Sequence, residues 1–447
     1  MGMELTELEQ FYAKHIRENR EEHEKSGKEA LEYLEHSTAK YKGKTIYSLY
    51  VPKLLNETTV ARFKEIAETM AGIMRKVIVA YRENPKYRCL FGFDKEVEEL
   101  IIQDPLYENV LPVCRVDIFY NEETGEFHFC ELNTDGSSSM NEDRELCIAF
   151  EKTALYKELS KEYEVKGFEL FDSLVEAFLE NYKTYPFHTE KPNVAIVDFL
   201  ELGCSMEEFQ QFRLSFEKYG CKAVVCDVRE LTLINDKLCT KDGMEIDLIY
   251  RRAVTSDICD RKEQVAAFLE AVKEAKVCCM GSFCTQVVHD KSLFYILRHD
   301  MTKELLSERE NTFVERHIPY TEELTDSVIG KTDILTKKEK WIIKPKNSYG
   351  ARGIFAGVSC PQEEWEKAVE ENKNKNYIMQ RFIMPYQTYN IDFHKKNDTL
   401  KKYSNLTGLY VYNGKFAGVY SRQSKKEIIS SEYDENDIAT VGLFERN

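Results

Sequence analysis

The sequence has no run of about 18 consecutive apolar residues, the length that a helix needs to cross a bilayer. Residues 1–25 are charged throughout and lack the apolar core of a secretory signal. Internal repeats and low-complexity tracts are also missing. These absences predict a protein of the cytoplasm that has no membrane partner.

Basic residues are in deficit, with 62 lysines and arginines against 78 acidic residues and a formal net charge of −16. A surface of that sign repels a phosphate backbone, so nucleic acid is not an expected partner. A small phosphorylated molecule is still compatible with this charge. The 13 cysteines follow no paired framework, which in a reducing cytosol indicates small buried side chains.

Two common nucleotide-binding motifs are missing as well. No GxGxxG occurs in the segment where strands and helices alternate, and the GKT at Gly330 lacks the earlier glycine of a Walker A loop because position 325 is threonine. No pairing of cysteine with histidine suggests nucleophilic catalysis. A reaction of this protein therefore has to depend on other groups.

Composition and periodicity predict a folded chain of several packed units, with 43% hydrophobic and 31% charged residues in a length of 447. Residues 1–110 are expected to be mainly helical, with Asn56 as a helix cap. Residues 111–185 begin with a β-hairpin and return to helix, and residues 190–285 alternate strand and helix as in a small Rossmann-like domain. Residues 286–447 mix strands and helices. The expected fold class is α/β, as a multidomain α+β chain.

The strongest polar cluster lies on the predicted hairpin. Arg115 and Asp117 alternate with apolar residues on the first strand, and Glu131 and Asn133 do so on the second, so each pair projects from one face. Alternation predicts Cys130 on the opposite face. The oxygens of Asp117, Glu131 and Asn133 suit Mg²⁺, and Arg115 suits a transferred phosphate or an oxyanion. An exposed, salt-bridged hairpin face is the alternative.

A second candidate segment is WIIKPKNSYGARGIF, in which an apolar strand delivers Lys344. The loop that follows contains Ser348, Gly350 and Gly353, and glycines let backbone amides approach phosphates closely. Lys291 lies upstream at a predicted helix start and could add a second positive charge. A hairpin turn with solvated lysines is the alternative.

The segment NYIMQRFI reads as a short strand whose backbone could pair with an adenine edge, through Gln380, Arg381, Phe382 and Ile383. An ordinary core strand is the alternative. Arg422 ends a later strand and is a candidate phosphate or carboxylate contact, with a surface arginine as the alternative.

Taken in order, these segments resemble the ATP-grasp superfamily. Lys291 lies in a DK at a helix start, HIPYTEEL follows, Lys344 precedes the glycine-containing loop, and YIMQRFI corresponds to the hinge strand. In that superfamily the magnesium-binding E-x-N strand comes after the hinge, whereas here CRVDIF and FCELNTDG come first. This circularly permuted order, with GLYVYNGKFAGVYSR near the end, resembles the synthetase domain of glutathionylspermidine synthase and its relatives.

The resemblance implies a permuted ATP-grasp fold with a Rossmann-like domain ahead of the nucleotide-binding part. It implies an ADP-forming ligase that joins a carboxylate to an amine through an acyl phosphate, with ATP and Mg²⁺ as cofactors. Lys291 and Lys344 would hold the phosphates, residues 380–383 the adenine, and Arg115 and Arg422 the acyl phosphate. Magnesium would be bound by Asp117, Glu131 and Asn133.

Two other functions stay open at this point: an ATP-grasp kinase of a small molecule, and a noncatalytic nucleotide-binding protein. The sequence has no amidase domain with a cysteine nucleophile, so glutathione and spermidine are not supported as substrates. A small carboxylic acid and an amine are the expected partners, and a homodimer is the default oligomer.

Overall fold

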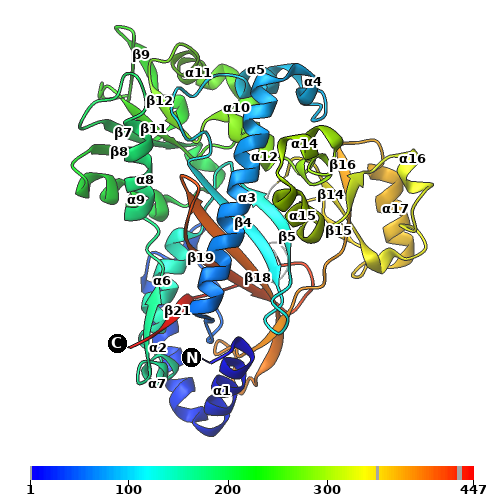
Figure 1. The fold of residues 1–447 in the computed structure, drawn as a ribbon. Coiled ribbons are helices and arrows are strands. Elements are labelled where there is room, and N and C mark those ends of the chain that lie inside the picture. Colours follow the sequence, from blue (N-terminus) through cyan, green and yellow to red (C-terminus); the bar gives the residue numbers. More distant parts are fainter. Residues whose placement is uncertain (1–2, 349–351, 430–434, 447) are drawn as a thin grey trace.

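The computed structural model describes residues 3–348, 352–429 and 435–446, which form a mixed α/β fold (Figure 1). In the N-terminal region, the Asn56 side chain accepts a hydrogen bond from Thr59 N at 2.8 Å and caps the longest helix, as predicted. Three short strands interrupt a region predicted to be mainly helical. The elements are α1 (Leu5–Glu18), α2 (Arg20–His36), β1 (Lys40–Tyr41), β2 (Lys44–Thr45), β3 (Lys53–Asn56), α3 (Glu57–Glu83), α4 (Pro85–Arg88) and α5 (Lys95–Ile101).

A six-stranded sheet joins the predicted hairpin to the C-terminal strands. Its strand order is β20-β19-β18-β4-β5, and β17 pairs with β18. Strands β4 and β18 are antiparallel neighbours although they are far apart in the sequence, so regions 111–185 and 286–447 share one sheet. The strands are β4 (Val113–Tyr120), β5 (Phe127–Asn133), β17 (Gln387–Asn390), β18 (Lys401–Tyr412), β19 (Lys415–Ser424) and β20 (Asn436–Ile438).

Helix α3 crosses one face of this sheet (Figure 1) and forms the main hydrophobic core with it. Phe63 and Met70 of α3 belong to the same buried cluster as Val116 of β4 and Leu409 of β18. Because side chains alternate along a strand, the opposite face of β4 carries Arg115 and its polar neighbours. The helix therefore fixes which face of the sheet is available to polar groups.

Residues 190–285 contain a four-stranded sheet of order β12-β11-β7-β8 in which every pairing is parallel. The predicted alternation of strand and helix is present, while the relation to Rossmann-like domains stays a prediction. The elements are β7 (Asn193–Asp198), α9 (Met206–Lys218), β8 (Lys222–Asp227), β9 (Thr232–Ile234), β10 (Lys237–Cys239), β11 (Leu248–Arg251), α10 (Thr255–Asp260), α11 (Ala266–Lys273) and β12 (Cys278–Met280).

A smaller antiparallel sheet, β13-β16-β14-β15, carries the second candidate segment. Trp341, Trp365 and Met379 form its separate core with helix α17. The elements are α12 (Gln286–His289), α13 (Leu293–Ile296), α14 (Asp300–Leu305), α15 (Glu308–His317), β13 (Thr321–Glu323), α16 (Asp326–Ile329), β14 (Trp341–Pro345), β15 (Phe355–Ala356), α17 (Gln362–Asn372) and β16 (Tyr377–Arg381).

One local prediction is wrong. Residues 141–183 were expected to be helical, but β6 (Tyr163–Gly167) separates α6 (Met140–Phe150) and α7 (Ala154–Leu159) from α8 (Asp172–Tyr182). Strand β6 pairs with β21 (Thr440–Glu445), so a distant partner overrides local helix propensity. Lys291 lies immediately before Ser292, the N-cap residue of α13 (Leu293–Ile296), so the predicted position at a helix start is confirmed. Among the described residues, no helix is both long and apolar enough to span a membrane.

Candidate functional site

A cavity of about 490 Å³ lies among the N-terminal region, the six-stranded sheet and the smaller sheet. This volume is in the range of small-molecule sites. Most of the residues singled out from the sequence line it, although they come from distant parts of the chain. They are Arg115, Glu131, Asn133, Lys291, Lys344, Gln380, Arg381, Phe382, Ile383 and Arg422.

Asp117 lies under the cavity, fully buried between two arginines. Its Oδ1 accepts from Arg115 Nε at 2.7 Å, and its Oδ2 accepts from Arg115 Nη2 at 3.0 Å and Arg422 Nη2 at 3.1 Å. Asn133 Nδ2 also donates to Oδ2, at 3.2 Å. These four donors occupy both carboxylate oxygens, so Asp117 fixes the two guanidinium groups and the amide in place.

The hairpin register explains this convergence. Arg115 pairs with Asn133 and Asp117 pairs with Glu131, which places all four side chains on one face, as predicted. A β-bulge follows, because Ile118 pairs with Phe129 and Cys130 has no partner in the ladder. Cys130 was expected to face away; the bulge instead brings it into the cavity wall.

Gly408 of β18 leaves the space that the ion pair of Arg115 and Asp117 occupies. A Cβ at this position would lie 2.7 Å from Arg115 Cδ and 2.8 Å from Asp117 Oδ1, closer than real Cβ atoms approach. We expect Gly408→Ala to lower the free energy of unfolding by about 1–3 kcal/mol, the usual cost of overpacking. Denaturant unfolding measures it.

Gly72→Ala is the matched control, because Gly72 lies inside α3 and an added Cβ would meet nothing within 4 Å. Alanine in a helix interior stabilises by about 0.5–1 kcal/mol relative to glycine, so the two substitutions should shift stability in opposite directions. A stabilising Gly408→Ala would contradict the assigned packing.

Two buried lysines supply positive charge to the cavity. Lys291 is 5% exposed and Lys344 is 6% exposed. Lys344 Nζ donates to Gln380 Oε1 at 3.0 Å and to the Cys130 carbonyl at 3.4 Å, and none of the described carboxylates forms an ion pair with it. Lys291 Nζ donates to the Ser348 carbonyl at 2.8 Å and lies 4.0 Å from Glu131 Oε1. Burial lowers the pKa of Lys291. Both ammonium groups thus have mainly neutral partners.

Glu131 is the carboxylate nearest these lysines. Burial opposes its ionisation, but Lys291, Arg422 and Lys344 outweigh burial and lower its pKa. Asn133 gives its Nδ2 to Asp117, and its Oδ1 accepts no hydrogen bond within the described chain. Glu131 and Asn133 therefore present oxygens that a hard cation prefers, whereas the oxygens of Asp117 are occupied.

The apolar end of the cavity is formed by the segment that follows β16, together with Ile342. The backbone N–H of Arg381 donates to the Tyr320 carbonyl and that of Phe382 to the Lys340 carbonyl, each at 2.8 Å. Ile383 N donates to no described residue. Of the backbone N–H groups at positions 381–383, that of Ile383 is thus available to a planar ligand edge.

The loop after β14 is described only in part. Gly350 lies outside the described residues. Ser348 Oγ donates to the Arg352 carbonyl at 3.0 Å. Gly353 has φ +71° and packs against Tyr377 and Pro345, so its backbone conformation and its close contacts favour glycine. Neither residue lines the cavity.

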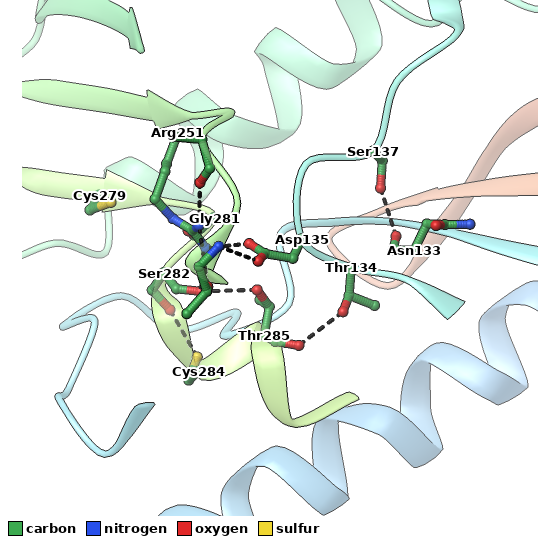
Figure 2. Close-up of polar contacts among 12 residues, drawn as sticks. Asn133, Thr134, Asp135, Ser137, Arg251, Cys279, Gly281, Ser282, Cys284 and Thr285 are labelled. Carbon is green, nitrogen blue, oxygen red and sulfur yellow. Dashed lines mark hydrogen bonds and ion pairs between the residues drawn. The ribbon is translucent and has the colours of Figure 1, made fainter. Parts of the chain in front are cut away.

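The loop between β5 and α6 is held against the parallel sheet, as Figure 2 shows. Asp135 forms an ion pair with Arg251 at 2.7 Å, and Thr134 Oγ1 donates to the Thr285 carbonyl at 2.9 Å. Arg252 donates to the Ser137 carbonyl. These buried contacts fix the polar loop that follows Asn133, and residues 135–139 line the cavity.

Other cavity residues were missed from the sequence. Tyr41 and residues 44–47 line the cavity although the N-terminal region carried no visible motif. Glu142 of α6 and Glu435 and Asp437 at β20 also line it, as does His289. The only sequence signal for Glu142 was its position at the end of the polar stretch TDGSSSMNE, which follows Asn133. These groups become neighbours through long-range pairing, which local patterns do not encode.

The sequence matches no protein-family model, and no curated protein matches it. A glutathione synthetase-like effector from Globodera pallida, solved in its apo form, superimposes with a TM-score of 0.57 and 11% sequence identity. The similarity covers 93% of this chain and 96% of that one, so the two share a fold over nearly their whole length. A putative gamma-glutamylcysteine synthetase from Methylobacillus flagellatus has a TM-score of 0.43 and 9% identity over 88% of this chain and 90% of its own. Its superposition is too loose to support an argument.

Proposed function

We propose that this protein binds Mg·ATP in a circularly permuted ATP-grasp fold and joins a substrate carboxylate to an amine, releasing ADP and phosphate. The observation that carries the proposal is the pair of buried lysines, Lys291 and Lys344, whose ammonium groups have mainly neutral partners in a ligand-sized cavity. Burying charge is costly, and Glu131, 4.0 Å from Lys291 Nζ, is the one carboxylate that forms an ion pair with either lysine among the described residues. A polyphosphate would supply direct counter-charge to both.

The pairing of β4 with β18 supports the permuted arrangement, because it places the early hairpin in one sheet with the C-terminal strands. The fold shared with a glutathione synthetase-like effector supports a synthetase scaffold. The finer resemblance, to the synthetase domain of glutathionylspermidine synthase, rests on the order of sequence motifs. Function is argued from the cavity, since one fold hosts many activities.

In the proposed complex, the triphosphate lies against Lys291 and Lys344, and the adenine lies against Phe382 and Ile383. The Ile383 N–H is the donor we assign to the adenine edge. Gln380 accepts from Lys344 and donates to Thr321 Oγ1 at 2.9 Å, so its side chain orients the lysine. Phosphoryl transfer depends mainly on such alignment and on charge neutralisation.

The residues present fit a magnesium ion that binds together with the nucleotide. Glu131 and Asn133 offer two oxygen ligands, and Mg²⁺ is commonly held by one or two carboxylates plus substrate phosphates. We now propose that Asp117, whose oxygens are occupied, orients Asn133 and does not itself bind the metal. When bound, magnesium would supply positive charge that neutralises the phosphates.

Arg115 and Arg422 are proposed to stabilise the acyl phosphate and the tetrahedral intermediate that follows. Both guanidinium groups are aligned by Asp117 before any ligand arrives. Charges that are fixed in advance stabilise developing negative charge without reorganisation at the moment of reaction. No side-chain nucleophile is required, because the substrate carboxylate attacks the γ-phosphorus itself.

The proposal is tested by calorimetry of ATP binding with and without Mg²⁺, followed by ADP release with panels of carboxylic acids. Hydroxylamine is the acceptor for the panel, since it converts an acyl phosphate into a hydroxamate whatever the natural amine is. Hydroxamate and ADP in equal amounts would support the ligase. A stable phosphorylated acid would identify a kinase, and ATP binding without turnover would identify a noncatalytic nucleotide-binding protein.

Replacing Glu131 with glutamine is expected to lower the affinity of the ATP-bound protein for Mg²⁺ by about 10- to 100-fold. Even residues that only orient a metal ligand contribute this much to metal affinity. The substitution keeps the shape of the side chain and removes its charge. Titration of Mg²⁺ into the protein with the nonhydrolysable analogue of ATP measures the effect. Glu371→Gln, on the exposed side of α17, is the control, and equal Mg²⁺ dependence in both variants would exclude Glu131 as a ligand.

A further inference from the structure

The cavity has an acidic end beyond the two arginines. Glu142 comes from the first turn of α6, and Asp437 lies on β20 directly opposite Arg422 of β19. Glu435 lies next to β20 and accepts from Arg422 Nη1 at 3.0 Å. Glu142, Glu435 and Asp437 all line the cavity. None of the three has a role in holding the nucleotide or the metal.

Glu142 is the group among them that has one oxygen without a hydrogen-bond partner in the described part of the chain. It is 5% exposed, its Oε1 lies 3.5 Å from Ser205 Oγ, and its Oε2 accepts no hydrogen bond from another described residue. A buried polar atom in a native protein is nearly always hydrogen-bonded. An unpartnered carboxylate oxygen at a cavity wall therefore points to a ligand that donates to it.

The surrounding charges do not compensate this carboxyl group. Arg252 pairs with Glu208 at 3.0 Å, and Arg422 is shared between Asp117 and Glu435. Glu208 and Asp437 act on Glu142 with charge of the same sign, and Arg252 is the guanidinium group that opposes them. A ligand with positive charge would add to that opposition.

Burial raises the pKa of Glu142 well above its ordinary value, and the neighbouring Glu208 and Asp437 raise it further. Burial and Glu435 raise the pKa of Asp437 to about 7. The Tyr420 hydroxyl donates to Asp437 Oδ1. Such an environment strengthens a carboxylate as a proton acceptor.

We propose that Glu142, assisted by Asp437, binds the acceptor amine as its ammonium ion and removes one proton from it. This inference rests on the proposed ligase function and names the catalytic base for its second step. An ammonium group has no lone pair with which to attack, so an amine ligase that works near neutral pH needs a proton acceptor beside the acyl phosphate.

One N–H proton moves from the ammonium nitrogen to the Glu142 carboxylate, which leaves the neutral amine with its lone pair. The nitrogen then attacks the acyl carbon, the C–N bond forms and the bond from carbon to the phosphate oxygen breaks. The second N–H proton leaves with the phosphate, and Glu142 returns its proton to solvent when the product leaves.

The test compares two kinds of acceptor in the Glu142→Gln variant, with the carboxylic acid found in the hydroxamate panel. Hydroxylamine is mostly unprotonated at neutral pH and needs no base, whereas ethylamine and glycine are ammonium ions. We expect amide formation with ethylamine or glycine to fall by about 10²- to 10⁴-fold, the usual contribution of a general base. Hydroxamate formation should stay within a few-fold of wild type.

The pH profile gives an independent readout. In Glu142→Gln, amide formation should rise about tenfold per pH unit as the free amine becomes more abundant, because the protein no longer removes the proton. Asp437→Asn should raise the KM for ethylamine and glycine more than it lowers kcat. Glu151→Gln, at the exposed C-terminal end of α6, is the control, and unchanged ATP affinity in all variants excludes misfolding.

The possible failures are distinguishable. If wild type forms no hydroxamate with any acid, the proposed ligase function fails. The assignment of the base is wrong if wild type forms hydroxamate but Glu142→Gln lowers hydroxamate and amide formation equally. It is also wrong if the substitution lowers neither rate. If His289→Gln, and not Glu142→Gln, shows the selective loss of amide formation, the base is His289, which also lines the cavity.

Discussion

The Lys344→Ala variant is expected to lose between about 30-fold and several thousand-fold in affinity for Mg·ATP, which corresponds to about 2–5 kcal/mol for truncating one partner of a buried charge pair. The reason is the local environment of the lysine, which is 6% exposed and hydrogen-bonded to neutral oxygens of Gln380 and Cys130. A phosphate would therefore meet an ammonium group that is already desolvated and is not neutralised by a carboxylate.

Calorimetry with ATP in excess Mg²⁺ measures the loss, and thermal unfolding without ligand checks that the variant folds. Lys367→Ala is the matched control, because Lys367 lies on α17 with its side chain 72% exposed beside Glu371. Equal ATP affinity in wild type and Lys344→Ala would remove the basis for placing the triphosphate at this end of the cavity.

The polar hairpin is the part of the site that sequence reasoning predicts best. Two-residue spacing fixes the face of a strand, so Arg115 with Asp117 and Glu131 with Asn133 had to project in pairs. The hairpin turn then brings the two strands together, and in the structure Asp117 pairs with Glu131. Apolar runs likewise predict β14 and β16, which deliver Lys344 and Gln380.

The sequence does not predict the position of any site residue that depends on a partner far away in the chain. Arg422 contacts Asp117 because β18 lies between β19 and β4, a pairing that no local pattern specifies. The same holds for Glu142, a charged residue in a helical first turn that would ordinarily be solvated. The bulge at Cys130 is also invisible to alternation, which assumes an uninterrupted ladder.

Asp117→Asn is expected to lower the free energy of unfolding by about 3–5 kcal/mol, as breaking a buried ion pair from one side usually does. The side chain is fully buried and accepts from Arg115, Asn133 and Arg422. An asparagine amide would offer one acceptor oxygen and would turn an N–H group toward a guanidinium group. Denaturant unfolding measures the loss, and Asp300→Asn, whose side chain is 91% exposed, should be neutral.

A double variant shows whether the loss of stability in Asp117→Asn comes from uncompensated charge or from lost packing. Arg422 keeps Glu435 as a second partner, whereas Arg115 has no carboxylate other than Asp117 among the described residues. If uncompensated charge causes the loss, adding Arg115→Gln to Asp117→Asn should recover part of the stability, because one unpaired guanidinium group is removed. Additive losses would instead mean that the two side chains stabilise the sheet by packing. In either case ATP binding should persist in the folded fraction, since Lys344 and Lys291 do not contact Asp117.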